Sequence, residues 1–253
     1  MHLYLSRLFQ CALLAAVATA AGACEEFATP AELAGPQILA VQTKPPAVRP
    51  GERVALEILV AGPDGEIEAP DVSWAVEPAA VGTAPIGTIE IEEDGSAYYR
   101  APAMVAEEPT FSAVRATVQV DDLELDAIKT LGVTILPFEN PSVSLLRADE
   151  QDLLAADAAL RLSPGQTVEL EVDIAPAIIN ITTFSWYATV GEIEEYRSNP
   201  TELIAPEEAA EGVLFVVVRD GLGGSTWAQV PIIVSGAASG AAAASAARGA
   251  AGP

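Results

Sequence analysis

The sequence predicts an all-β protein, built as two β-sandwich domains in series behind an export leader. Three observations support this fold class. Apolar residues alternate with a period of two along several segments, the same succession of segments occurs twice, and turn-forming Gly, Pro and Asp separate them.

Residues 1–23 have the make-up of a secretory leader. A short basic region ends at Arg7, an apolar run follows, and the small residues 21–23 precede Cys24. The apolar run is interrupted by Gln10 and falls short of the ~20 strongly apolar residues that a membrane span needs. We therefore expect cleavage directly before Cys24.

A run of small residues that ends at a cysteine resembles the lipobox of bacterial lipoproteins. The resemblance implies that Cys24 is acylated and that lipid chains anchor the protein in the cell envelope, in the outer membrane or facing the periplasm. Ala21-Gly22-Ala23 also fits ordinary secretory cleavage, so a secreted protein without lipid stays open. Both routes leave Cys24 as the first residue.

Cleavage leaves 11 basic and 36 acidic residues, a net charge of −25, no histidine and one cysteine. No internal disulfide is then possible, so the fold depends on its apolar core. Such an acidic surface argues against nucleic acid and anionic lipid headgroups as partners. The acids are scattered along the chain, which is typical of solvated strand faces and loops.

The boundaries follow from composition. We expect a tether over residues 24–36, a first domain over 37–137, a second over 138–236, and a disordered Ala/Gly tail over 237–253. One irregular stretch, residues 148–162, lies between the first and second strands of the second domain. A short helix or a solvated loop would both fit it.

The duplication begins with one strand in each half. Pro50-Gly51 precedes RVALEILV, and Pro164-Gly165 precedes QTVELEVDI. Four apolar residues alternate with others in each segment, which predicts a half-buried strand. They are Val54, Leu56, Ile58 and Val60 in the first half, and Val168, Leu170, Val172 and Ile174 in the second.

A tryptophan recurs downstream in each half, Trp74 in VSWAV and Trp186 in FSWYA. Each half then closes with a predicted hairpin, because Asp and Gly favour the turn conformations that hairpins need. The other corresponding segments are residues 87–90 with 191–194, residues 99–102 with 203–206, and the hairpin turns at 121–122 and 220–224.

Each half has about the size of one sandwich, with roughly seven short strands and a tryptophan in the third. Over residues 37–236 the chain resembles tandem bacterial Ig-like or PKD-like repeats. The resemblance implies immunoglobulin-like sandwiches that serve in non-catalytic binding or structural presentation, with an envelope protein or a polysaccharide as partner.

Catalytic signatures are absent from the mature sequence. Without histidine, Ser-His-Asp and Cys-His nucleophiles and histidine metal sites are excluded. Neither Lys44 nor Lys129 stands in an S-x-x-K arrangement. Paired carboxylates leave glycoside hydrolysis as a third-ranked option, but a sandwich of this size rarely carries the deep cleft it needs. We expect no enzymatic activity.

Calcium is the cofactor that the residue types would allow, and we expect no other. Ca²⁺ prefers carboxylate and carbonyl oxygens of flexible loops, and Asp121, Asp122 and Asp220 lie in the two predicted hairpin turns. The same acids also favour turns without any metal. A calcium-dependent adhesion or carbohydrate-binding module is therefore the alternative function.

One outer face of the second domain is predicted to be apolar. If Trp186 points inward, Tyr187 points outward, and taking Val213, Phe215 and Val217 as core leaves their neighbours outside. Such a face usually marks a contact, although it could pack on residues 148–162, or the register could be shifted by one residue. The predicted binding face is Tyr187, Leu214, Val216, Val218 and Trp227, and the polar counterpart in the first domain is Ser73, Ala75, Arg115, Thr117 and Gln119.

In the carbohydrate-binding alternative, Tyr187 and Trp227 would stack on sugar rings. If the face instead binds a partner protein, truncation of Trp227 to Ala should leave folding largely intact and abolish binding. A loss of several kcal/mol of stability would show that Trp227 is internal packing.

Overall fold

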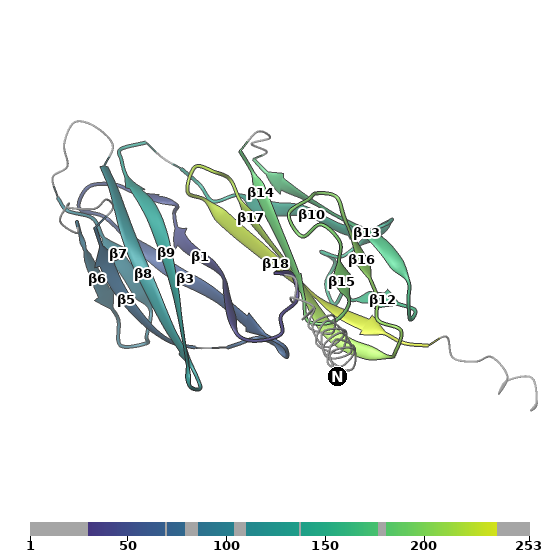
Figure 1. The fold of residues 1–253 in the computed structure, drawn as a ribbon. Helices are drawn as coiled ribbons and strands as arrows, with labels where there is room; N and C mark the ends of the chain where they lie inside the picture. The colour runs from purple at the N-terminus through teal and green to yellow at the C-terminus, as the bar shows by residue number, and fades with distance from the viewer. Residues whose placement is uncertain are drawn as a thin grey trace, which may run out of the picture.

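The computed structural model describes residues 30–68, 70–78, 86–103, 110–136, 138–176 and 181–236. Within these ranges the chain forms strands and turns and contains no helix, which confirms the predicted all-β class (Figure 1). Over the same ranges no helical segment of membrane-spanning length and hydrophobicity occurs. The leader, Cys24, residues 24–29 of the predicted tether and the tail at 237–253 lie outside the described residues.

The first sandwich consists of two sheets. One has the order β1 (Gln37–Lys44), β3 (Arg53–Gly62), β7 (Ala97–Arg100) and β6 (Thr88–Ile91), with β4 (Gly65–Glu66) paired to β3. The other has the order β2 (Ala47–Val48), β9 (Leu123–Val133), β8 (Thr110–Val120) and β5 (Asp71–Glu77).

The second sandwich repeats this order. One sheet runs β11 (Gln151–Asp152), β10 (Ser142–Ala148), β13 (Thr167–Ala175), β16 (Thr201–Ile204) and β15 (Glu192–Ile193). The other runs β12 (Leu160–Leu162), β18 (Ser225–Val234), β17 (Ala210–Arg219) and β14 (Thr183–Ala188). Both domains thus have the strand order of immunoglobulin-like sandwiches, as the sequence predicts.

The stretch over residues 148–162 is neither a helix nor a free loop. It contains β11 and β12, and it buries three leucines in the core of the second domain. These are Leu153, Leu160 and Leu162. The spacing of its leucines therefore reflects two short strand segments that return to the sandwich.

The duplication is visible in matched backbone hydrogen bonds. The Gly51 N–H donates to the Pro102 carbonyl over 2.9 Å, and the Gly165 N–H donates to the Pro206 carbonyl over 3.1 Å. Both glycines have positive φ, 77° and 68°, a conformation that glycine adopts without strain. In each domain a short strand also pairs in parallel with the last strand, β2 with β9 and β12 with β18.

The two cores differ in their central aromatic residue. Trp186 is fully buried, and its indole N–H donates to the Ser198 carbonyl over 2.8 Å. Trp74 is only half-buried, and the fully buried aromatic residue of the first core is Tyr99, which donates to the Ile86 carbonyl over 2.9 Å. A buried tryptophan was thus predicted correctly for the second domain and only in part for the first.

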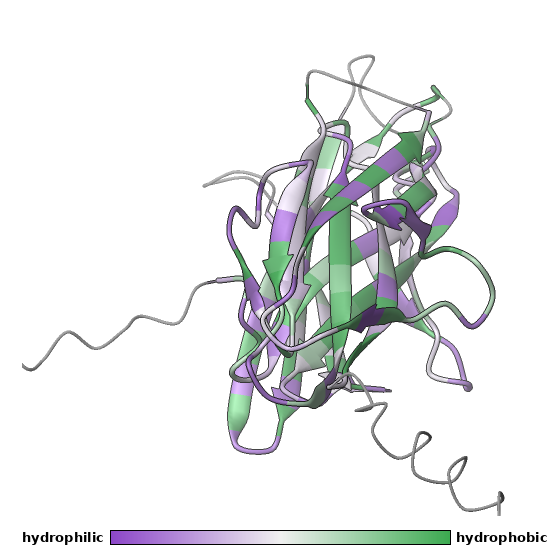
Figure 2. Ribbon diagram, turned by 90° about the vertical axis from the view of Figure 1, so that its right-hand side faces the viewer, coloured by the Kyte–Doolittle hydropathy of each residue, from purple (hydrophilic) through white to green (hydrophobic). Residues whose placement is uncertain are grey.

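Side chains alternate between the two faces along the strands, as the period of two predicts. Figure 2 shows this alternation as hydrophobic and hydrophilic segments that follow one another along the ribbons. Val54 and Leu56 of β3 lie in the first core, and Val168, Leu170 and Val172 of β13 lie in the second.

Two glycines of the first domain, Gly87 and Gly95, differ in how closely other atoms pack around them. Gly87 and Gly95 have nearly equal φ, 85° and 86°. A methyl group at Gly87 would meet the Arg100 carbonyl oxygen and the Tyr99 ring at 2.5 Å, whereas one at Gly95 would meet nothing within 4 Å.

We expect Gly95→Ala to lose about 1–2 kcal/mol of unfolding free energy from backbone strain alone. Gly87→Ala should lose about 1–3 kcal/mol more, because the added methyl overpacks the site. Urea denaturation of both variants measures the difference. Equal losses would contradict the close packing at Gly87.

Candidate functional site: the contact between the two sandwiches

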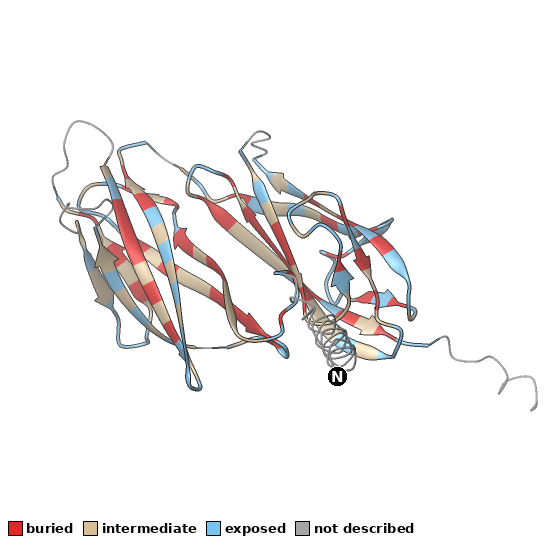
Figure 3. Ribbon diagram, viewed as in Figure 1, coloured by how far each residue is buried: buried red, intermediate tan, exposed pale blue. Residues whose placement is uncertain are grey.

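The outer face of β14, β17 and β18 packs against the outer face of β1 and β3. Phe215 and Val217 of the second domain are fully buried there, against Leu59 and Ala61 of β3, which are also fully buried. Figure 3 shows buried segments on the strands of both domains where the sandwiches meet. The other members of this apolar cluster are Leu33, Leu39 and Ala40, with Tyr187, Val213 and Trp227 partly buried beside them.

The register of β17 differs from the predicted one. Trp186 lies directly opposite Val216, and Tyr187 lies opposite Phe215. Since directly opposed residues of an antiparallel pair share a face, Val216 points into the second core with Trp186. The orientation predicted for Leu214, Val216 and Val218 is therefore wrong: all three are core residues of the second domain.

Tyr187 and Trp227 do point away from the second core, but the first domain covers their face. The contact predicted for this face is thus made within the chain, and not on residues 148–162. The polar residues Ser73, Arg115 and Gln119 of the first domain lie exposed or half-exposed on its opposite sheet.

Polar bonds seal one side of the apolar contact. β1 is the edge strand of its sheet, and its carbonyl oxygens accept hydrogen bonds from side chains of the second half of the chain. Side chains that cover an edge strand in this way hinder its pairing with other chains. The bonds run from Arg219 Nη2 to Leu39 at 2.8 Å, from Asn140 Nδ2 to Thr43 at 2.7 Å and from Ser225 Oγ to Val41 at 3.4 Å.

The segment before β1 is hydrogen-bonded to the second domain, and its Leu33 packs in the apolar cluster that joins both domains. The Ala188 N–H donates to the Ala31 carbonyl over 3.0 Å, and the Leu33 N–H donates to the Ala188 carbonyl over 3.2 Å. Ala31 and Leu33 are each only 2% exposed. Over its described part, the predicted tether is therefore bound to the second domain through a single β-bridge at Glu32 and is not a free spacer.

Lys129 also crosses between the domains. From β9 its Nζ donates to the Gly223 carbonyl, in the β17–β18 turn, over 2.5 Å. Burial lowers the pKa of this lysine, the nearby charge of Arg219 lowers it further, and the carboxylate of Asp220 opposes both. The ammonium group is thus held at a structural position with its proton less tightly bound than in water.

The three aspartates predicted as calcium ligands are not gathered into a site. Asp121 and Asp122 lie in the β8–β9 turn, at the end of the first domain away from the β17–β18 turn that holds Asp220 (Figure 1). The Asp220 carboxylate accepts the N–H groups of Leu222 and Gly224, at 2.7 and 2.8 Å, within its own turn. No group of three or more Asp, Glu, His or Cys side chains suited to a metal occurs in the described chain.

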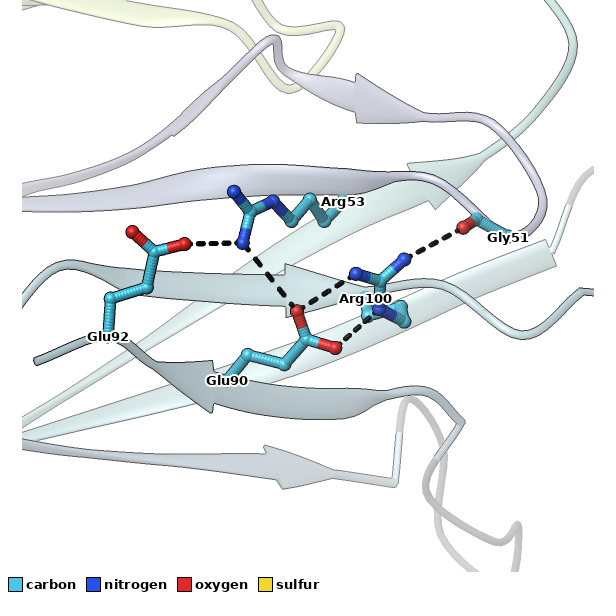
Figure 4. Close-up of polar contacts among 5 residues, drawn as sticks. All are labelled: Gly51, Arg53, Glu90, Glu92 and Arg100. Carbon is cyan, nitrogen blue, oxygen red and sulfur yellow. Dashed lines mark hydrogen bonds and ion pairs between the residues drawn. The ribbon is translucent and has the colours of Figure 1, made fainter.

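A cluster of charged residues lies on the outer face of β3, β6 and β7 (Figure 4). Arg53 Nη1 contacts Glu92 at 2.6 Å, and Arg100 binds Glu90 through two nitrogens. The hydrogen bond from Arg100 holds the pKa of Glu90 below its ordinary value. These opposite charges pair across neighbouring strands, so the cluster stabilises the sheet.

Several open grooves accompany the sandwiches, and a tryptophan lines two of them. One, of about 500 Å³, lies beside Trp227 at the domain contact and is lined by Gln42, Lys44 and Asn140 among others. The other, of about 660 Å³, lies in the first domain beside Trp74. Sequence reasoning singled out Trp227 but missed the groove at Trp74, because it took that ring to be buried.

No protein-family model matches the chain, and no curated protein does. Solved structures of tandem modules are similar to it at low identity. A chimeric titin Z1Z2 pair is 14% identical, with 81% of this chain and 99% of that one covered and a TM-score of 0.25. The Ig1-2 module of the Drosophila receptor protein tyrosine phosphatase DLAR is 14% identical, with 79% and 99% covered and a TM-score of 0.30.

Fibronectin(III)-like modules of Clostridium thermocellum CbhA are also 14% identical, with 79% of this chain and 94% of that one covered and a TM-score of 0.31. Similarity of this degree does not extend to function. The fold assignment depends on the strand order of the chain itself, which is that of an immunoglobulin-like sandwich.

Val217 and Val218 are adjacent, fully buried and on opposite faces of β17. We expect Val217→Asp to separate the domains while both stay folded, because the charge is placed in the contact between them. Small-angle scattering should then give a larger radius of gyration. Val218→Asp should instead unfold the second domain. The reverse pattern would contradict the register described here.

Lys129 predicts a pH dependence of stability. Its folded pKa lies below the ordinary value of 10.5, so between these two values the unfolded chain binds more protons and stability rises with pH. We expect Lys129→Met to remove this rise, as measured by urea denaturation across the alkaline range. Lys44, the other lysine of the chain and an exposed one, gives the matched control Lys44→Met, which should keep it.

Proposed function

We propose that this chain is an exported, lipid-anchored and non-catalytic module of the bacterial cell envelope, which presents two sandwiches as one stiff body. The observation that carries the proposal is the apolar contact of Phe215 and Val217 with Leu59 and Ala61. Flexible tandem modules join their domains through exposed linkers, with few contacts between them. Here the two sheets bury their outer faces on each other.

The surfaces that correspond to this contact elsewhere in the molecule differ from it in composition. In the second domain, the face equivalent to β1–β3 lies on β10 and β13 and exposes Ser144, Glu169 and Asp173. In the first domain, the face equivalent to β14–β17–β18 exposes Ser73 and Gln119 beside the apolar Phe111 and Ile128. The β10–β13 face thus lacks the apolar residues by which β1 and β3 make the contact, which fits a single presented unit.

The docked N-terminal segment fits attachment close to a membrane. Pro30 is the first described residue, and Cys24 stands six residues before it. A chain of this length spans at most about 20 Å when fully extended. With Ala31 and Leu33 held on β14, an acylated Cys24 would keep the second domain near the bilayer.

The described side chains also fit a module without catalytic chemistry. Lys129, whose pKa burial lowers, is bound to the Gly223 carbonyl inside the domain contact. Asp220 caps its own turn. Binding of an envelope protein or polysaccharide is then the remaining role for the exposed surface, and no observation favours the calcium-dependent alternative.

The anchor is tested with the two cysteines of the precursor. We expect Cys24→Ser to move the protein from the membrane fraction to the soluble fraction, because the acylated residue is lost. Cys11→Ser, inside the leader, is the matched control and should leave the protein in the membrane. Mass spectrometry of the N-terminal peptide should show acyl chains on Cys24; a free thiol there would contradict the proposal.

A further inference from the structure

One edge of the first sandwich is open. β5 is hydrogen-bonded to β8 on one side, and its other edge meets no strand within the described ranges. The strand runs from Asp71 to Glu77, so several backbone N–H and C=O groups face outward along it. Proteins normally cover or blunt such an edge.

The equivalent edge of the second domain is covered. β14 corresponds to β5 through Trp186 and Trp74, and it pairs at Ala188 with the segment at Ala31–Leu33. Next to this bridge, the Trp186 N–H donates to the Tyr196 carbonyl over 2.8 Å. An extended segment from outside the sandwich thus completes this edge, and its Ala31 side chain joins the second core.

The residues matching Trp186 and Ala188 in β5 are Trp74 and Val76. The loop that covers Trp186, residues 194–200, has only the tight turn at residues 92–95 as its counterpart. Trp74 therefore stays half-buried and lines the groove of about 660 Å³. The apolar lining also includes Leu56, Ile58, Val72 and Ile91, of which Ile91 is 58% exposed.

Carboxylates lie in the wall of this groove and next to it. Asp71 lies at its wall, and Glu93 and Asp94 lie in the turn that contributes Gly95 and Ser96. All three carboxylates are exposed, and none of them forms an ion pair with a described residue. An occupant with basic residues beside its apolar ones would complement these charges.

We propose that the β5 edge and the groove beside it bind an extended polypeptide segment of another protein. The segment adds to the sheet as a strand, with small apolar side chains at alternate positions over Trp74 and with Lys or Arg at its flanks. Only a polypeptide can form the ladder of backbone hydrogen bonds with β5. We therefore infer a protein, and not a polysaccharide, as the partner. This inference rests on the proposed binding role and is independent of the lipid anchor.

The test uses the soluble mature chain, residues 24–253 with Cys24→Ser, labelled with ¹⁵N. The probe is a synthetic peptide with the sequence of residues 30–34, PAELA, flanked by two lysines on each side. We expect it to shift the amide signals of residues 71–77 and to saturate at about 0.1–1 mM. A peptide with glutamate flanks should bind at least about tenfold more weakly.

Two variants locate the site. Trp74→Ala should weaken the lysine-flanked peptide about tenfold, because it removes the groove wall. Ala75→Ser, on the outer face of the same strand and outside the lining of the groove, is the matched control and should change the affinity less than about twofold. If Trp74→Ala fails to fold, Ile91→Ala at the exposed rim replaces it and should weaken binding severalfold.

The proposal is overturned if the peptide leaves residues 71–77 unshifted at about 5 mM, or if both peptides bind equally well. Shifts confined to the groove at Trp227 would overturn it too, as would polysaccharide fragments that shift the Trp74 groove in place of the peptide. Self-association through β5, measured by sedimentation, would also overturn the proposal, because a second copy of this chain would then occupy the edge. None of these outcomes bears on whether Cys24 carries lipid.

Discussion

The burial of Phe215 and Val217 against Leu59 and Ala61 is the interaction on which the architecture depends. Each of these four side chains is fully buried, and all four lie in one apolar cluster on the outer faces of the two sandwiches. Full burial of a large apolar side chain contributes about 1.5–3 kcal/mol. This contact and the hydrogen bonds on the β1 edge stabilise the two sandwiches together.

The duplicated domains show that one fold can leave the same sheet edge either covered or open. Strand order and the glycine turns are the same in both domains, but the surroundings of the tryptophans at equivalent positions, Trp74 and Trp186, are not. In the second domain a loop and the N-terminal segment close over Trp186. In the first, a shorter turn leaves Trp74 beside a groove and a free strand edge. The β14 edge of the second domain is thus covered, and the equivalent β5 edge of the first domain is open.

The sequence predicts the strands, the duplication and the turns well, because alternation and turn residues are local signals. The sequence could not show which residues of β17 point into the core of the second domain. Its VLFVVV run is apolar on both faces, so alternation gives no signal there. The strand register, in which Val216 lies directly opposite Trp186, is seen only in the structure. Ala31 and Leu33 gave no signal either, because two apolar residues in a polar segment resemble a linker.

Calorimetry of the soluble mature chain tests most directly whether the two sandwiches form one body. We expect a single cooperative transition in which the calorimetric and van't Hoff enthalpies agree. For some 200 residues the unfolding enthalpy should be about 140 kcal/mol. Two separate transitions, each with about half of that enthalpy, would show that the domains unfold independently and would contradict it.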